Sequence, residues 1–234
     1  MGTADRALIT EIREALAVAG DPGRAEDQQR YMKSQMPYRG IASPQLKALL
    51  RPLLAGRPPA DRGTWVGTIL ALWDEAEYRE ERYAAIAMAR HRSGRQWQDP
   101  RALELYRHLV VTGAWWDLVD EVAAHLVGGV LAAHRAEVTP VIRHWMVDEH
   151  LWLRRTAVLC QLRHRAGTDT ALLHDAIEAN VDDTSFWLRK AIGWALRSHA
   201  YSDPDWVRAQ VALYGDRMSG LSRREALKNI GAGG

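Results

Sequence analysis

The sequence predicts an all-α protein in which helical pairs stack into a curved solenoid with a concave inner surface. Turn signals divide the 234 residues into segments whose apolar residues recur at helical spacing, and few segments alternate with the period of two that is typical of strands. A short motif also recurs after about 35 residues, a length in the range of helical-hairpin repeats. We expect about a dozen helices in one domain over residues 1–234, because no segment resembles an interdomain linker.

Composition indicates an ordinary soluble protein. The chain is 47% hydrophobic and 26% charged, and it has one cysteine, Cys160, so it can form no internal disulfide. The first 16 residues are too charged for a signal peptide, and no run of about 18 apolar residues occurs. We therefore expect a cytoplasmic protein.

The charge balance is close to neutral but its chemistry is biased. The formal net charge is +2, and only four of the 31 cations are lysines. Arginine forks onto phosphates as well as carboxylates, although a GC-rich genome would explain the same bias. Charge alone therefore names no partner.

Several helices are predicted from local signals. Asp5 to Ala19 is amphipathic, with an apolar side formed by Leu8, Ile9, Ile12, Leu16 and Ala19. Ser43-Pro44 and Asp203-Pro204 each place a capping side chain before a proline at the first helical position. We expect a helix to begin at both.

The repeated motif aligns Leu151–Val158 with Phe186–Gly193, and residues 81–86 resemble a weaker copy. In the second copy aromatic and cationic residues share one helical face, opposite an apolar stripe of Leu188, Ile192 and Ala195. That face carries Trp187, Lys190, Trp194 and Arg197. The first copy has the same pattern in Trp152, Arg155 and Leu159, followed by Arg163. Such a face suits nucleic acid, whereas the alternative interpretation places the tryptophans in the core with the cations reaching past them to solvent.

The segment from Ala114 to Asp120 is the most informative. Trp116 and Asp120 are four residues apart, so they share a helical face about one turn apart. An aromatic face beside an anion suits a cation or a transition state that develops positive charge. We expect Trp115 to be structural. Asp117 and Asp120 would each ordinarily be solvated or paired with an arginine, and the functional interpretation of Asp120 depends on its helical neighbour Trp116, together with Arg155 and Trp194.

Other chemistries lack support. No phosphate-binding loop, dinucleotide-binding motif, HExxH zinc motif or GxSxG elbow occurs. The nine histidines are scattered, so the sequence gives no support for metal catalysis.

From about Arg30 to Lys228 the chain resembles the AlkD family of DNA alkylation repair glycosylases, which are built from HEAT-like repeats. The resemblance rests on motifs that occur in the same order, namely Arg30-Tyr31-Met32-Lys33, Gly40-Ile41, Trp115-Trp116-Asp117-x-Val119-Asp120, Arg155-x-Ala157-x-Leu159-x-Gln161-Leu162, Lys190-Ala191-Ile192-Gly193-Trp194-x-Leu196-Arg197 and Leu221-Ser222-x-Arg224-Glu225-Ala226.

This resemblance implies a site. It places the aromatic pair that flanks the damaged nucleotide on Trp116 and Trp194, and the catalytic carboxylate on Asp120. The expected DNA contacts are Arg155, which matches a phosphate-binding arginine, and Tyr31, Lys33, Lys190 and Arg197.

The resemblance also implies a reaction, the hydrolysis of the N-glycosidic bond of cationic alkylated purines in duplex DNA without base flipping. The expected lesions are 3-methyladenine and 7-methylguanine; a self-resistance enzyme for bulky natural-product adducts is a specialised form that the sequence does not separate. The resemblance implies no cofactor and no metal. We expect a monomer that associates with the nucleoid when bound to DNA.

Two interpretations compete with a glycosylase. One is a catalytically silent helical-repeat module that binds nucleic acid or a protein partner. A buried salt bridge between Asp120 and a structural arginine, with Asp120 pointing away from the concave face, would favour it. The other, a small-molecule enzyme, lacks a compact set of polar groups.

Overall fold

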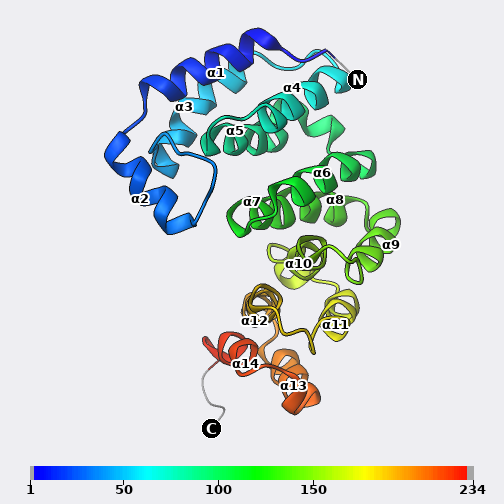
Figure 1. The fold of residues 1–234 in the computed structure, drawn as a ribbon. Coiled ribbons are helices and arrows are strands. Elements are labelled where there is room, and N and C mark those ends of the chain that lie inside the picture. The colour runs from blue at the N-terminus through cyan, green and yellow to red at the C-terminus, as the bar shows by residue number, and fades with distance from the viewer. Residues whose placement is uncertain (1–2, 231–234) are drawn as a thin grey trace. The chain divides into compact units, whose positions relative to one another are not determined.

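Helices make up the regular secondary structure of residues 3–230, the part of the chain that the computed structural model describes (Figure 1). Within this part there are fourteen α-helices and no strand, which confirms the predicted all-α class. None of these helices is long and apolar enough to cross a bilayer. The chain divides into two compact units, unit 1 up to Gln98 and unit 2 from Asp99, so the single domain over residues 1–234 stays a prediction.

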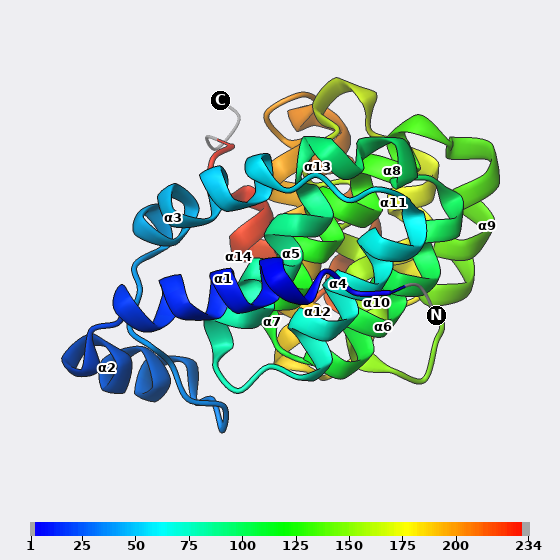
Figure 2. The ribbon, with the colours of Figure 1, turned by 90° about the horizontal axis from the view of Figure 1, so that it is seen from above.

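Unit 1 consists of five α-helices and a short 3₁₀ helix. They are α1 (Arg6–Val18), α2 (Pro22–Met32), α3 (Ser43–Gly56), α4 (Arg62–Asp74), α5 (Arg79–Arg90) and η1 (Arg92–Trp97). Helix α1 contacts α3, α4 and α5, whereas α2 lies at the edge of the unit (Figure 2).

Unit 2 holds nine α-helices with short helical connections. They are η2 (Pro100–Ala102), α6 (Leu103–Gly113), α7 (Trp116–Glu121), the π-helix η3 (Val122–Val127), α8 (Gly128–Ala133), α9 (Arg135–Trp145), α10 (Leu151–Leu159), η4 (Arg165–Gly167), α11 (Thr170–Glu178), α12 (Phe186–His199), α13 (Pro204–Tyr214), η5 (Gly215–Arg217) and α14 (Gly220–Leu227).

The local helix signals were mostly reliable. Helix α1 has Asp5 as its N-cap, accepting from the N–H of Leu8. It buries Leu8, Ile9, Ile12 and Leu16 of the predicted apolar side, whereas Ala19 is its C-cap and is partly exposed. Asp203 caps α13 by accepting from the N–H of Trp206. The helix predicted to begin at Ser43-Pro44 is confirmed, but the capping role of Ser43 is wrong: the N-cap of α3 is Ala42, and no side chain caps it. Ser43 is itself the first residue of α3, one position too late for its hydroxyl to act as the N-cap.

A buried carboxylate organises the segment that follows α2 in unit 1. Glu80, fully buried on α5, accepts hydrogen bonds from the backbone N–H groups of Arg39, Gly40 and Ile41 at 2.9–3.2 Å. Gly40 has φ +86°, and a Cβ there would lie 2.0 Å from the Asp21 carbonyl oxygen. Only glycine fits this position, so the carboxylate and the glycine together hold the connection between α2 and α3.

The helices of unit 2 form two rows, with α10, α12 and α14 in succession and α9, α11 and α13 beside them (Figure 1). Hydrogen bonds between successive repeats join residues 32 to 36 positions apart. Examples are His164 to the Gly128 carbonyl, Ser198 to the Leu162 carbonyl, and Arg155 to the Trp187 carbonyl. These separations confirm the predicted repeat of about 35 residues. The weaker copy at residues 81–86 lies on α5 in unit 1 and stays a prediction.

Helices α12 and α14 approach each other closely at Gly193. A Cβ on Gly193 would lie 2.5 Å from the Cβ of Glu225 and 2.8 Å from the carbonyl oxygen of Ser222. The Ser222 hydroxyl donates to the Arg189 carbonyl at 2.8 Å, which holds the two backbones at this distance. The missing side chain therefore sets how near α14 lies to α12.

Replacing Gly193→Ala should lower the free energy of unfolding by about 1–3 kcal/mol, because the new methyl group must push backbone atoms apart. Chemical denaturation measures the change. Gly129→Ala is the matched control: a Cβ at Gly129 in α8 meets no atom within 4 Å, so the helical preference of alanine should raise stability by about 0.5–1 kcal/mol. Equal stability of the two variants would show that the contact at Gly193 is not restrictive.

Candidate functional site

Helix α7 presents Trp116 and Asp120 on one face. Ala114 adopts a left-handed conformation with φ +36°, which ends α6, and Trp115 is extended as the N-cap of α7. Trp116 is thus the first residue of α7, and Asp120 follows one turn later. The predicted spacing of the aromatic ring and the carboxylate is confirmed.

A π-helix follows directly after this pair, and no sequence signal predicted it. Residues Val122–Val127 form η3 between α7 and α8. Gly128 follows the last residue of η3 and packs closely against the residue after α10: a Cβ on Gly128 would lie 2.2 Å from the Cys160 carbonyl oxygen. Single π turns inside helices are rare and frequently occur at functional sites. The widened turn begins two residues after Asp120.

Asp120 is held by a buried arginine. Arg155 on α10 donates from Nε to Oδ1 of Asp120 at 2.7 Å and from Nη2 to Oδ2 at 2.8 Å. Its remaining nitrogen, Nη1, donates to the carbonyl of Trp187 on α12. The Arg155 side chain is 3% exposed and that of Asp120 is 12% exposed. One guanidinium therefore links α7, α10 and α12, and the carboxylate is the more exposed partner of the pair.

Burial raises the pKa of the Asp120 carboxyl above its usual range. The hydrogen bonds and positive charge of Arg155 oppose this effect, and the neighbouring Asp117 and Glu121 add to it. A carboxylate that is poorly hydrated interacts strongly with a positive charge that forms beside it.

Aromatic rings pack around the arginine. Trp115, Trp152 and Trp187 form a cluster with ring centroids 5.2–6.2 Å apart, and the Arg155 Cζ lies 6.0 Å and 5.9 Å from the rings of Trp152 and Trp187. The structural role expected for Trp115 is confirmed. Of the exposed face expected for the first repeat copy, Arg163 is exposed, but the expectation is wrong for Trp152, Arg155 and Leu159, which are all buried. Their neighbours on α7 and α12 cover them.

Trp116 and Trp194 differ from this cluster. Both are partly exposed, and among residues 3–230 neither ring has an aromatic or cationic partner. Trp194 lies two turns after Trp187 on α12. Their ring faces are therefore not occupied by protein stacking partners.

Two predicted DNA contacts are paired with a residue that sequence reasoning missed. Lys190 Nζ and Arg197 Nη1 each lie 2.6 Å from an oxygen of Glu225 on α14. The hydrogen bond from Lys190 is the main cause that lowers the pKa of Glu225, and burial opposes it. The available signal was a single acid within the basic run Arg223-Arg224-Glu225, which precedes Lys228.

The charged groups follow the repeat. Asp120, Arg155, Lys190 and Glu225 are spaced by 35 residues each, and they pair as Asp120 with Arg155 and Lys190 with Glu225. Arg155 is directed inward toward Asp120. A phosphate contact by Arg155 stays a prediction, and it would require the guanidinium to bind the phosphate and Asp120 at the same time. The contacts predicted for Lys190 and Arg197 also stay predictions.

Tyr31 and Lys33 lie in unit 1. Tyr31 on α2 is 77% exposed, and Lys33 ends α2 in a left-handed conformation with φ 51°. Unit 1 also carries an open hollow of about 390 Å³, where the guanidinium carbon of Arg39 lies 3.8 Å from the ring centroid of Tyr78. The DNA contacts of Tyr31 and Lys33 stay predictions.

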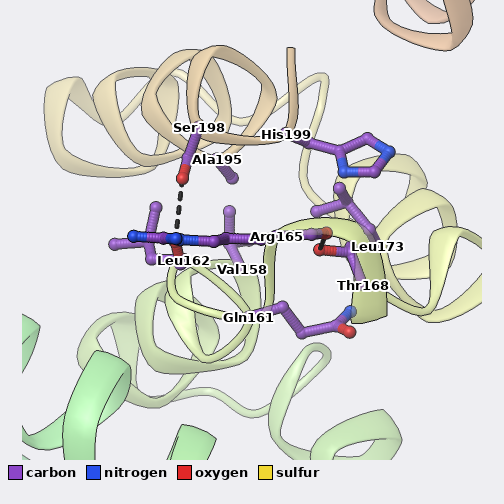
Figure 3. Close-up of a pocket in the computed structure, with 9 residues that line it drawn as sticks. All are labelled: Val158, Gln161, Leu162, Arg165, Thr168, Leu173, Ala195, Ser198 and His199. Carbon is purple, nitrogen blue, oxygen red and sulfur yellow. Dashed lines mark hydrogen bonds between the residues drawn. The ribbon is translucent and has the colours of Figure 1, made fainter. Parts of the chain in front are cut away.

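A small cavity in unit 2 lies among α10, η4, α11 and α12 (Figure 3). Its volume is about 10 Å³, room for one water molecule, and Ser198 beside it donates to the Leu162 carbonyl at 2.8 Å. A purine does not fit there.

Burial raises the pKa of the Cys160 thiol to about 12, so this cysteine is not a nucleophile at neutral pH. No group of three or more His, Cys, Asp or Glu residues within the described chain is arranged to hold a metal ion.

Comparison with known proteins identifies the family. The sequence model of a family described as DNA alkylation repair enzyme matches residues 12–230. A solved structure described as a predicted DNA alkylation repair enzyme from Enterococcus faecalis is 29% identical, with a TM-score of 0.83 over 92% of this chain and 98% of that one. Among curated proteins no sequence matches. Since the family match spans nearly the whole chain, the protein belongs to the DNA alkylation repair enzyme family.

Proposed function

We propose that this protein is a DNA glycosylase that hydrolyses the N-glycosidic bond of cationic alkylated purines, such as 3-methyladenine and 7-methylguanine. Family membership implies DNA as the substrate. The observation that carries the proposal is the pairing of Asp120 with Arg155, because it holds a poorly hydrated carboxylate one turn from the ring of Trp116. That arrangement suits a reaction whose transition state gains positive charge.

The reaction balances without a cofactor. Alkylation at N3 or N7 makes the purine cationic, so the bond between C1′ and the base nitrogen breaks with its electron pair leaving on the base, which becomes neutral. The deoxyribose gains oxocarbenium character. Water then attacks C1′ and gives up one proton, leaving an abasic site. Asp120 would stabilise the oxocarbenium and orient the water, as carboxylates do in other glycosyl transfers.

Arg155 acts in this proposal as a positioning residue. Its two-point hydrogen bond fixes the plane of the Asp120 carboxylate, and its third bond, to the Trp187 carbonyl, prevents the guanidinium from turning. The tryptophan cluster fills the space behind it. The carboxylate therefore needs little reorganisation when charge develops beside it.

Trp116 and Trp194 would hold the deoxyribose through their ring faces and favour the cation through ring electrostatics. Lys190, Arg197, Tyr31 and Lys33 would contact the DNA backbone, with Arg155 as a further contact when its pair is shared, which gives affinity without sequence preference. We propose action as a monomer on nucleoid DNA and without base flipping. Bulky N3 or N7 adducts would then be accepted as well.

One observation favours a second candidate function, a catalytically silent module that binds nucleic acid. Asp120 forms a buried salt bridge with an arginine that is itself structural, which is how a purely architectural carboxylate would look. The 12% exposure of Asp120 against 3% for Arg155 favours the enzyme, since an architectural pair gains nothing from leaving its anion at the surface. A silent module would bind DNA and release no base.

Asp120→Asn should lower the release of 7-methylguanine and 3-methyladenine from methylated duplex DNA by roughly 10²- to 10³-fold, because the amide keeps the shape but loses the charge. Chromatography of released bases measures the effect, and anisotropy with fluorescent duplex should show DNA binding retained. Unchanged release by the variant would remove Asp120 from the mechanism. No release by the wild type, with DNA binding present, would support the silent module.

The rate should also depend on pH through Asp120. Because burial raises the pKa of this carboxyl above 3.8, the active anion is lost as the pH falls toward that raised pKa, and the enzyme-dependent rate should fall on the acid side. The same proton is bound more tightly by the folded protein, so Asp120 lowers folding stability as pH rises through this window. Subtracting the rate without enzyme removes acid-catalysed depurination, and the acid limb should be absent from the residual activity of Asp120→Asn.

Arg155→Lys tests the positioning role. Lysine keeps the charge but lacks the fork, so the rate at neutral pH should fall about ten- to hundredfold and the acid limb should move to higher pH. Arg154→Lys is the matched control, because Arg154 on the same helix pairs with Asp183 at 3.0 Å and should be exchangeable. A lower rate with an unmoved acid limb would contradict the role assigned to Arg155.

A further inference from the structure

The carboxylate of Glu225 engages two cations at once. Lys190 Nζ lies 2.6 Å from Oε1, and Arg197 Nη1 lies 2.6 Å from Oε2. Both cations come from α12, whereas the carboxylate comes from the next inner helix, α14. Charge-assisted hydrogen bonds of this kind are the strong ones, so each cation in the free protein already has an anionic partner.

These cations flank Trp194. Lys190 lies four residues before Trp194 and Arg197 three residues after it, so all three share one face of α12. The Lys190 and Arg197 side chains are 38% and 24% exposed, against 15% for Glu225. The cations therefore form the outer surface and the carboxylate lies beneath them. A phosphate that approached this face would meet the same donors that Glu225 uses.

The part of α14 that carries Glu225 is held against α12. The Cβ of Glu225 lies against Gly193, where a methyl group would be 2.5 Å away, and Ser222 one turn earlier on α14 is bonded to the Arg189 carbonyl. The pKa of Glu225 is lowered, mainly by the hydrogen bond from Lys190, so it is ionised at neutral pH. A fixed and permanently charged anion therefore lies beneath the two cations.

We propose that Glu225 is an affinity-limiting residue that competes with the DNA backbone for Lys190 and Arg197. This inference rests on the proposed function, because it requires that α12 faces DNA. With Glu225 present the three side chains carry one net positive charge, and a bound phosphate shares donors with the carboxylate. The protein thereby binds undamaged duplex less tightly and releases it faster, which suits an enzyme that must leave its product and search for rare lesions.

The test compares binding of a fluorescent undamaged duplex by the full-length wild type, Glu225→Gln and Glu178→Gln between 50 and 200 mM KCl. Glu178 on α11 pairs with Arg217, so its variant makes the same change in net charge away from α12. Glu225→Gln should bind more tightly than the wild type, with a salt slope steeper by about one to two units for one or two extra phosphate contacts. The gain should accordingly shrink about three- to twelvefold across this salt range. Glu178→Gln should bind within about twofold of the wild type, following the screening of exposed charges.

Glu225→Asp serves as a second variant. It keeps a carboxylate on α14, so an ion pair between α14 and α12 can still form. Its shorter side chain cannot reach both cations, and its affinity and salt slope should lie between those of the wild type and Glu225→Gln. Weaker binding by both variants would overturn the proposal and make Glu225 a structural tie. Equal gains for Glu225→Gln and Glu178→Gln would also overturn it, as a net-charge effect. Failure of the wild type to bind duplex would instead refute the proposed function, and with it the competition.

Discussion

The ion pair between Arg155 and Asp120 is the interaction on which the candidate site depends. It joins α7 to α10 through two short hydrogen bonds and reaches α12 through the Trp187 carbonyl. Removing either partner would leave an uncompensated buried charge, at a cost of about 3–5 kcal/mol, yet such pairs add little net stability over a well-packed apolar replacement. The pair is therefore better explained by the need to keep an anion in this place than by stability.

The same 35-residue spacing produces two ion pairs with opposite polarity. In the pair of Asp120 with Arg155 the cation is the more buried partner, whereas in the pair of Lys190 with Glu225 it is the carboxylate. The more exposed partner is consequently an anion in one repeat and a cation in the next. The repeat can thus supply an anion, Asp120, for the positive charge that forms on the sugar, and in the next repeat a cation, Lys190, for a phosphate.

Sequence reasoning succeeded where the deciding interactions are local. The apolar side of α1 and the capping of α13 by Asp203 depend on residues within one or two turns, and both were predicted. Ser43 was a plausible cap, but α3 begins one residue earlier than the Ser-Pro pattern implied, so Ser43 lies inside the helix. The spacing of Trp116 and Asp120 was predictable because the helical period alone sets it.

The sequence by itself determined the all-α class, the repeat of about 35 residues, and the helical faces on which Trp116, Asp120 and Trp194 lie, since these follow from periodicity along a single chain segment. Only the tertiary structure decided that Arg155 turns inward to Asp120. It also decided that Glu225 forms ion pairs with Lys190 and Arg197, the two cations expected to contact DNA. Those outcomes depend on the separation between neighbouring helices, which close contacts such as the one at Gly193 set and which no helical period encodes.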